Sequence, residues 1–156
     1  MSTQKSNKYF LLLMLGLALI SLLALFGGVA ATLVSSIITN LEGGEPIGFP
    51  IPFEHYRIAG AVNILGGLIG AGGAVGVFKR AKWGLGLAII STVILWLNGV
   101  ALGGHMLVYT PPGDLPAFMQ AQMTFMAVGL IIIITALCGG LVWLSRKEEV
   151  LSEFGG

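Results

Sequence analysis

The chain has 156 residues, of which 56% are hydrophobic and only 10% are charged, and its mean hydropathy is +0.94. Soluble domains carry about 25% charged residues, and a domain of this length cannot hide so much apolar surface in one core. The composition therefore excludes an ordinary soluble domain and predicts an integral membrane protein. A net charge of only +1 gives no indication of a nucleic-acid partner.

Four apolar runs, each free of Asp, Glu, Lys and Arg, are long enough to cross a bilayer, which takes about 20 residues. They cover residues 10–39, 58–78, 84–108 and 117–144. The connections are residues 40–57, 79–83 and 109–116, and a tail follows at 145–156. All six prolines fall in the connections, where turns are expected. We therefore expect one membrane domain, an all-α bundle of four antiparallel transmembrane helices.

The first apolar run follows two basic residues, Lys5 and Lys8, as the apolar core of a signal peptide does. It continues to Thr39, however, far beyond the about 7–15 apolar residues of a signal peptide. We expect an uncleaved membrane anchor. The tail at 145–156 is short and mixed in charge, and we expect it to be a frayed helix in the cytoplasm.

The cations predict the orientation of the chain. Seven of the eight lie before the first run, between the second and third, or after the fourth: Lys5, Lys8, Lys79, Arg80, Lys82, Arg146 and Lys147. Positive residues accumulate on the cytoplasmic side of a membrane. Both termini and residues 79–83 are therefore expected in the cytoplasm, with residues 40–57 and 109–116 outside the plasma membrane.

Glycine is concentrated in the second apolar run. In lipid, small residues let helix backbones approach closely and so allow helices to associate. The residues expected to act in this way are Gly66, Gly67, Gly70, Gly72, Gly73 and Gly76. The glycines predict either packing within the bundle or a face on which a partner subunit or cofactor docks.

Few residues could perform chemistry. Cys138 is the single cysteine, and we interpret it as a small buried packing residue. Motifs typical of phosphate binding, of zinc proteases and of serine hydrolases do not occur. Proton pumps and ion-coupled transporters keep ionisable side chains within the membrane. The four runs contain no Asp, Glu, Lys or Arg that could serve in this way. We expect no enzymatic activity of the chain on its own.

Polar residues gather in the outer half of the predicted bundle. Asn98, His105 and Tyr109 form one stripe of the third helix, because their spacing follows the helical repeat. The others in this half are Asn63, Gln120 and Thr124, with His55 and Tyr56 in the loop above. Three interpretations stay open: hydrogen bonds between helices, a quinone or lipid-headgroup pocket with His105 as donor, and a metal or haem site using His105, His55 or methionine.

Residues 57–106, RIAGAVNILGGLIGAGGAVGVFKRAKWGLGLAIISTVILWLNGVALGGHM, resemble DoxX-like four-helix membrane proteins in the order of their features. In that family a glycine-rich second helix follows an outer loop with proline, ends in a short basic turn, and precedes a third helix closed by histidine. Many members carry a glutamate in the second helix, and Asn63 stands in that region here. Some members are linked to quinone-dependent sulfur oxidation or to redox partners, so the resemblance implies a redox neighbourhood.

Two functions follow as hypotheses. The first is a non-catalytic subunit that packs against larger membrane proteins, in a respiratory or photosynthetic complex, or against further copies of itself. The second is a DoxX-like redox-associated protein with a quinone or cofactor pocket in the outer leaflet. The residues that would line such a pocket are His105, Asn98, Tyr109, Gln120 and Asn63.

Overall fold

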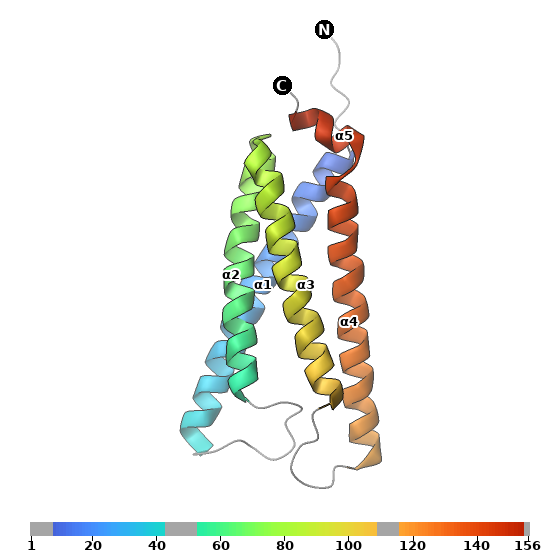
Figure 1. Cartoon of the computed structure of the whole chain (residues 1–156). Coiled ribbons are helices and arrows are strands. Elements are labelled where there is room, and N and C mark those ends of the chain that lie inside the picture. The colour runs from blue at the N-terminus through green and yellow to red at the C-terminus, as the bar shows by residue number, and fades with distance from the viewer. Residues whose placement is uncertain (1–7, 43–52, 109–115, 155–156) are drawn as a thin grey trace.

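The computed structural model of the chain describes residues 8–42, 53–108 and 116–154 (Figure 1). The long helices are α1 (Lys8–Glu42), α2 (Phe53–Phe78), α3 (Lys82–Val108) and α4 (Ala117–Ser145). A short helix α5 (Glu148–Leu151) and a 3₁₀ turn η1 (Ser152–Phe154) follow. No strand occurs in the described residues.

The four long helices confirm the four predicted spans. Each is long and apolar enough to cross a membrane, and the protein itself buries only 17–33% of the most apolar window of each. A soluble bundle would have to cover these side chains, whereas lipid solvates them. These helices mark the chain as a membrane protein.

Helix α2 begins five residues earlier than the sequence predicted. It starts at Phe53, immediately after Pro52, and Glu54 lies in its first turn. Proline disfavours the helical conformation of the residue before it, so helices commonly begin at or just after a proline, and an acidic residue in the first turn interacts favourably with the helix dipole. The assignment of residues 53–57 to the loop was therefore wrong, and His55 lies on the first turn of α2.

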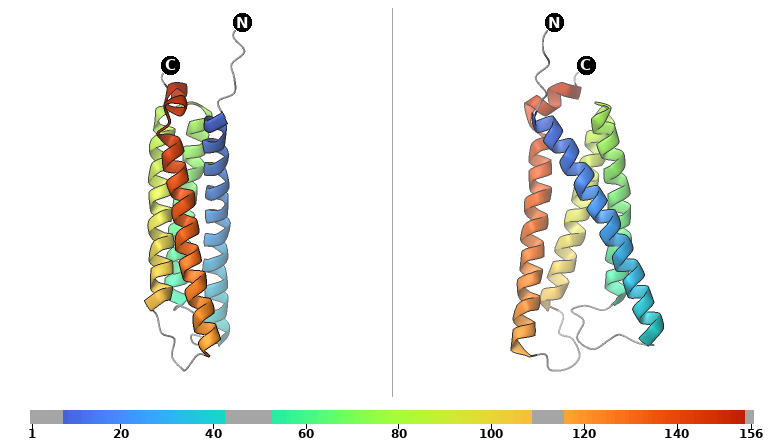
Figure 2. Two further views of the ribbon diagram at one scale, coloured as in Figure 1. Left: turned by 90° about the vertical axis from the view of Figure 1, so that its right-hand side faces the viewer. Right: turned by 180° about the vertical axis from the view of Figure 1, so that it is seen from behind.

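The helices pack in chain order, α1 on α2, α2 on α3 and α3 on α4. We call the end where α1 begins and α4 ends the termini end, and the opposite end the loop end. Near the termini end α1 reaches α4, where Tyr9 meets Trp143 edge-on with ring centroids 6.5 Å apart. Toward the loop end α1 and α4 separate widely, so that the bundle is open on that side (Figures 1 and 2).

Close contact between backbones joins α2 to both of its neighbours. A Cβ atom placed on Gly28 of α1 would lie 2.6 Å from the carbonyl oxygen of Gly60 in α2. On the other face of α2, a Cβ on Gly76 would lie 2.6 Å from the Cα of Gly84 in α3. No side chain fits at these two crossings, which explains why the residues that meet there are glycines.

The turn between α2 and α3 ends α2 with the two hydrogen bonds of a Schellman motif. The amide of Ala81 donates to the Gly76 carbonyl at 2.9 Å, and the amide of Arg80 donates to the Val77 carbonyl at 2.8 Å. This motif needs a left-handed residue, usually glycine. Here Arg80 takes that conformation, with φ of 55°.

The segment after α4 folds back over the termini end of the bundle. Val150 of α5 and Phe154 of η1 are almost fully buried. They belong to a cluster with Leu13, Leu17, Val77, Ala88 and Leu141. The prediction of a frayed helix was wrong, because these two apolar side chains cover core residues that the spans leave open at this end. Arg80 adds an ion pair to Glu153, with 3.2 Å between Nη1 and Oε2.

Candidate functional site

Asn98 is the centre of the polar group at the loop end. Its Nδ2 donates one hydrogen bond to the Asn63 Oδ1 at 2.8 Å and another to the Ala59 carbonyl at 3.0 Å. Both protons of the amide are thereby used in joining α3 to α2. Toward a ligand, Asn98 can offer only its carbonyl oxygen.

Two histidines stack beside this asparagine. His55, on the first turn of α2, and His105, in the last turn of α3, have ring centroids 4.3 Å apart and planes inclined by 20°. The earlier start of α2 makes this pair possible. The sequence placed His55 in a loop above the bundle, and so it did not predict the stacking.

A cavity of about 210 Å³ lies next to the histidine pair, between α2 and α3. Its lining consists of His55, Ile58, Ala59, Asn98, Ala101, Leu102 and His105. Pockets that enclose a whole drug-sized ligand measure about 300–1,000 Å³. This cavity is smaller and has about the size of one ring or one lipid headgroup.

The cavity includes only part of the predicted pocket. His105 and Asn98 line it, and Asn63 lies behind Asn98 as a hydrogen-bond acceptor. Gln120 is on an exposed face of α4 and is not part of the lining; its backbone carbonyl accepts a hydrogen bond from the Thr124 hydroxyl at 3.0 Å. Tyr109 lies outside the described residues.

The stacked imidazoles present faces to each other, whereas metal-binding lone pairs lie in the plane of the ring. The two rings therefore do not converge on a common ion in this arrangement. Within residues 8–42, 53–108 and 116–154, no three His, Cys, Asp or Glu residues form a group that could hold a metal. The geometry favours hydrogen bonding or stacking over metal binding.

A second cavity, of about 280 Å³, lies between α3 and α4 nearer the middle of the bundle. Its lining is Thr92, Val93, Trp96, Thr135, Cys138, Gly139 and Val142. The Trp96 Nε1 donates to the Thr135 hydroxyl at 3.1 Å and so bridges the two helices. The sequence analysis missed this pair, because a tryptophan and a threonine 39 residues apart show no pattern.

Five of the six predicted packing glycines are in tight contact with neighbouring helices. A Cβ on any of them would come within 3.0 Å of an atom of α1 or α3: Gly66, Gly67, Gly70, Gly73 and Gly76. Gly72 differs, because a Cβ there would meet only Leu87, at an ordinary 3.6 Å. The chain's own helices thus cover both glycine faces of α2, and these five positions are not open to a partner.

Two serines complete this packing, and the sequence did not single them out. The Ser91 hydroxyl donates to the Gly66 carbonyl at 2.7 Å in a buried position. Ser21 of α1 and Ser91 of α3 both lie against Gly70, where an added Cβ would meet the hydroxyl oxygens of both. Small hydroxyl side chains can do this because glycine leaves room for them and its exposed carbonyl accepts their protons.

Comparison with known proteins gives no match: no family model, no curated protein and no solved structure is similar to this chain. The resemblance of residues 57–106 to DoxX-like proteins therefore stays a prediction from the sequence. The function has to be inferred from the arrangement of the residues described above.

Proposed function

We propose that the chain is a non-catalytic, multi-pass membrane subunit that packs against larger membrane proteins. The observation that carries this proposal is the open bundle: toward the loop end, α4 is in contact with α3 but lies far from α1 (Figure 2). A respiratory or photosynthetic complex is the class of assembly that we expect. The alternative is a homo-oligomer of this chain.

The free face of α4 has the composition of a surface for another helix. It combines large exposed side chains, such as Phe125 at 80% exposure, with Gly129 and Gly140, where an added Cβ would meet nothing within 4 Å. Alternation of large and small residues lets a second helix approach closely in lipid, where close packing drives association. This supports α4 as the element that meets the partner.

We propose that the helices form an antiparallel bundle with the termini end and residues 79–83 in the cytoplasm of the cell, in the plasma membrane. The support is the distribution of cations: Lys8, Lys79, Arg80, Lys82, Arg146 and Lys147 all belong to the termini end.

This orientation predicts the accessibility of single cysteines introduced in a Cys138→Ser background. Cysteines at Ser2, Ala81 and Ser152 should resist an impermeant maleimide in intact cells and react after the cells are opened. A cysteine at Gly44 should react in intact cells. Labelling of the Ala81 position from outside would contradict the four-span topology.

A second candidate function is a quinone or cofactor site in the outer leaflet, as in the DoxX-like resemblance. The cavity beside His55, Asn98 and His105 favours it, because its volume is sufficient for one ring and its lining includes two imidazoles and an amide oxygen. In this case His105 would hydrogen-bond a quinone carbonyl, and Asn98 would orient the loop end of α3 through its bonds to α2.

Purification from the native membrane in mild detergent distinguishes the two. A subunit should elute with stoichiometric larger partners, and Gly129→Leu should release them while the chain itself stays folded. The matched control is Gly104→Leu on α3, another position with no atom within 4 Å of an added Cβ. A chain that elutes without partners, carries extractable quinone and loses it in His105→Ala would instead support the second candidate.

A further inference from the structure

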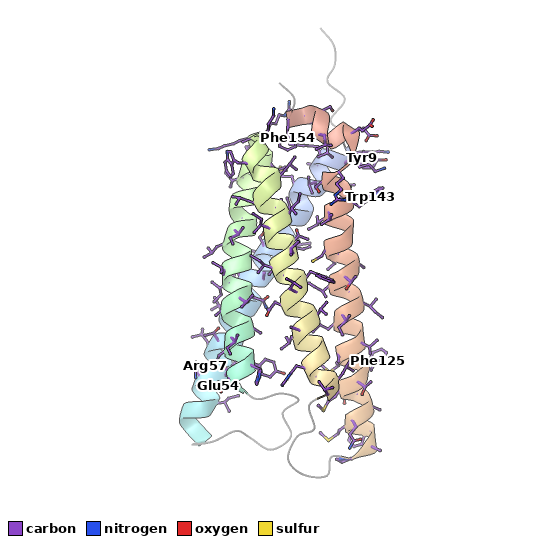
Figure 3. The ribbon with its side chains drawn as sticks, viewed as in Figure 1. Tyr9, Glu54, Arg57, Phe125, Trp143 and Phe154 are labelled. Atoms are coloured by element: carbon purple, nitrogen blue, oxygen red, sulfur yellow. The ribbon has the colours of Figure 1, made fainter. Side chains whose placement is uncertain are left out.

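Two ammonium groups from opposite ends of the sequence lie near the same aromatic ring at the termini end. The Nζ of Lys8, where α1 begins, lies 5.3 Å from the centre of the Tyr9 ring. The Nζ of Lys147, just after α4, lies 5.7 Å from the same ring and 4.1 Å from that of Trp143. Figure 3 shows Tyr9 and Trp143 together where these two helices meet. We call Lys8, Tyr9, Trp143 and Lys147 the basic corner.

Aromatic faces attract these cations, but they do not neutralise the two charges. Glu148 and Glu149 follow Lys147 directly on α5, but neither Lys8 nor Lys147 forms an ion pair with a carboxylate of the described residues. Elsewhere at this end, Arg80 is paired with Glu153 and lies over the Phe10 ring. The basic corner therefore has the arrangement of a site where an anion would stabilise both lysines at once.

The surroundings indicate an anion attached to lipid. Tyr and Trp are enriched where a membrane meets water, with the ring in the apolar layer and the polar atom at the headgroups. Below Lys8 on the same stripe of α1 lie three exposed leucines, Leu12, Leu15 and Leu19, at 53–58% exposure. An acyl chain can follow this stripe while a phosphate stays at the level of the lysines.

We propose that the basic corner binds the phosphate of an anionic phospholipid. Lys8 and Lys147 would each donate to the phosphate oxygens, and Trp143 and Tyr9 would hold the glycerol backbone at the interface. Basic sites between helices at the membrane surface are a known form of binding site for anionic lipid headgroups. The basic corner lies at the opposite end of α4 from Phe125 (Figure 3), although Gly140 of the proposed partner surface is within one turn of Trp143.

The test is native mass spectrometry of the delipidated chain with phosphatidylglycerol and phosphatidylcholine of identical acyl chains. The wild-type protein should retain phosphatidylglycerol at least tenfold more tightly. Lys8→Gln/Lys147→Gln should lose this preference, and Lys8→Arg/Lys147→Arg should keep it. The control is Lys79→Gln/Lys82→Gln, which removes the same charge from exposed positions at the α2–α3 turn and should keep the preference.

Three results would overturn the proposal. Equal retention of the two lipids by the wild-type protein would exclude an anion-selective site. Equal loss of the preference for phosphatidylglycerol in Lys8→Gln/Lys147→Gln and in Lys79→Gln/Lys82→Gln would show that net charge alone attracts the lipid. A rise in melting temperature with inorganic phosphate as large as that with phosphatidylglycerol would assign the site to a soluble anion. The comparison of melting temperatures uses the wild-type chain, so it does not depend on how well any variant folds.

Discussion

Gly73→Ala and Gly76→Ala are each expected to lower the free energy of unfolding by about 1–3 kcal/mol, the usual cost of overpacking. The added methyl group at Gly73 would lie 2.8 Å from the backbone nitrogen of Ala88, and that at Gly76 would lie 2.6 Å from the Cα of Gly84. Backbone atoms cannot rotate away as a side chain can, so α2 and α3 would have to separate. Unfolding of the purified chain in detergent, followed by circular dichroism, measures the change.

The neighbouring Gly72→Ala is the control for these variants. Its methyl group would meet only the Leu87 Cδ1, at 3.6 Å, and alanine favours a helix over glycine by about 1 kcal/mol in water. This variant should therefore be neutral or slightly more stable. Equal destabilisation by all three alanines would contradict the assignment of Gly73 and Gly76 to a close backbone contact.

Phe154→Ala is expected to detach the segment after α4 from the bundle. Truncation of a buried phenylalanine costs about 3–5 kcal/mol in a packed core. Because α5 and η1 can undock while the four spans stay folded, the effect should be local opening and not loss of the whole fold. Limited trypsin digestion after Arg146 and Lys147 should become at least tenfold faster, whereas melting of the spans should change little.

Leu151→Ala and Glu153→Gln complete this series. Leu151 is 47% exposed, so its truncation should leave the cleavage rate near that of the wild-type chain. Loss of the Arg80–Glu153 pair should have a small effect, because Arg80 is 49% exposed and exposed ion pairs contribute about 0.2–1 kcal/mol. A cleavage rate for Phe154→Ala no higher than for Leu151→Ala would mean that the tail is held by something other than its apolar contacts.

The apolar runs predicted the four spans, and most helix ends lie within three residues of the predicted positions. Each span depends on solvation of its own side chains by lipid, so it can be predicted from the composition of that segment alone. The start of α2 and the docking of Phe154 could not be read in this way. The first depends on one turn of helix after Pro52, and the second on an uncovered end of the core that forms only when the spans assemble.

The candidate site shows the same limit. Asn98 and His105 stood out as polar residues on one stripe of an apolar helix, and both line the cavity. His55 was noticed but left in a loop, and Gln120 was included although α4 presents it on an exposed face. Periodicity indicates which residues share a face of a helix, but it does not indicate which helix that face meets.

The position of Phe154 also bears on how the chain is made. Phe154 belongs to a buried cluster to which α1, α2, α3 and α4 all contribute, through Leu17, Val77, Ala88 and Leu141 among others. All four helices precede Phe154 in the sequence, so they are synthesised before it leaves the ribosome. A chain in which one span has failed to insert or to pack offers no complete site, and Val150 and Phe154 then stay exposed to water. Docking of this short segment thus requires that all four helices have packed. In a chain that has not assembled, the exposed apolar side chains of the segment would be available to chaperones and proteases.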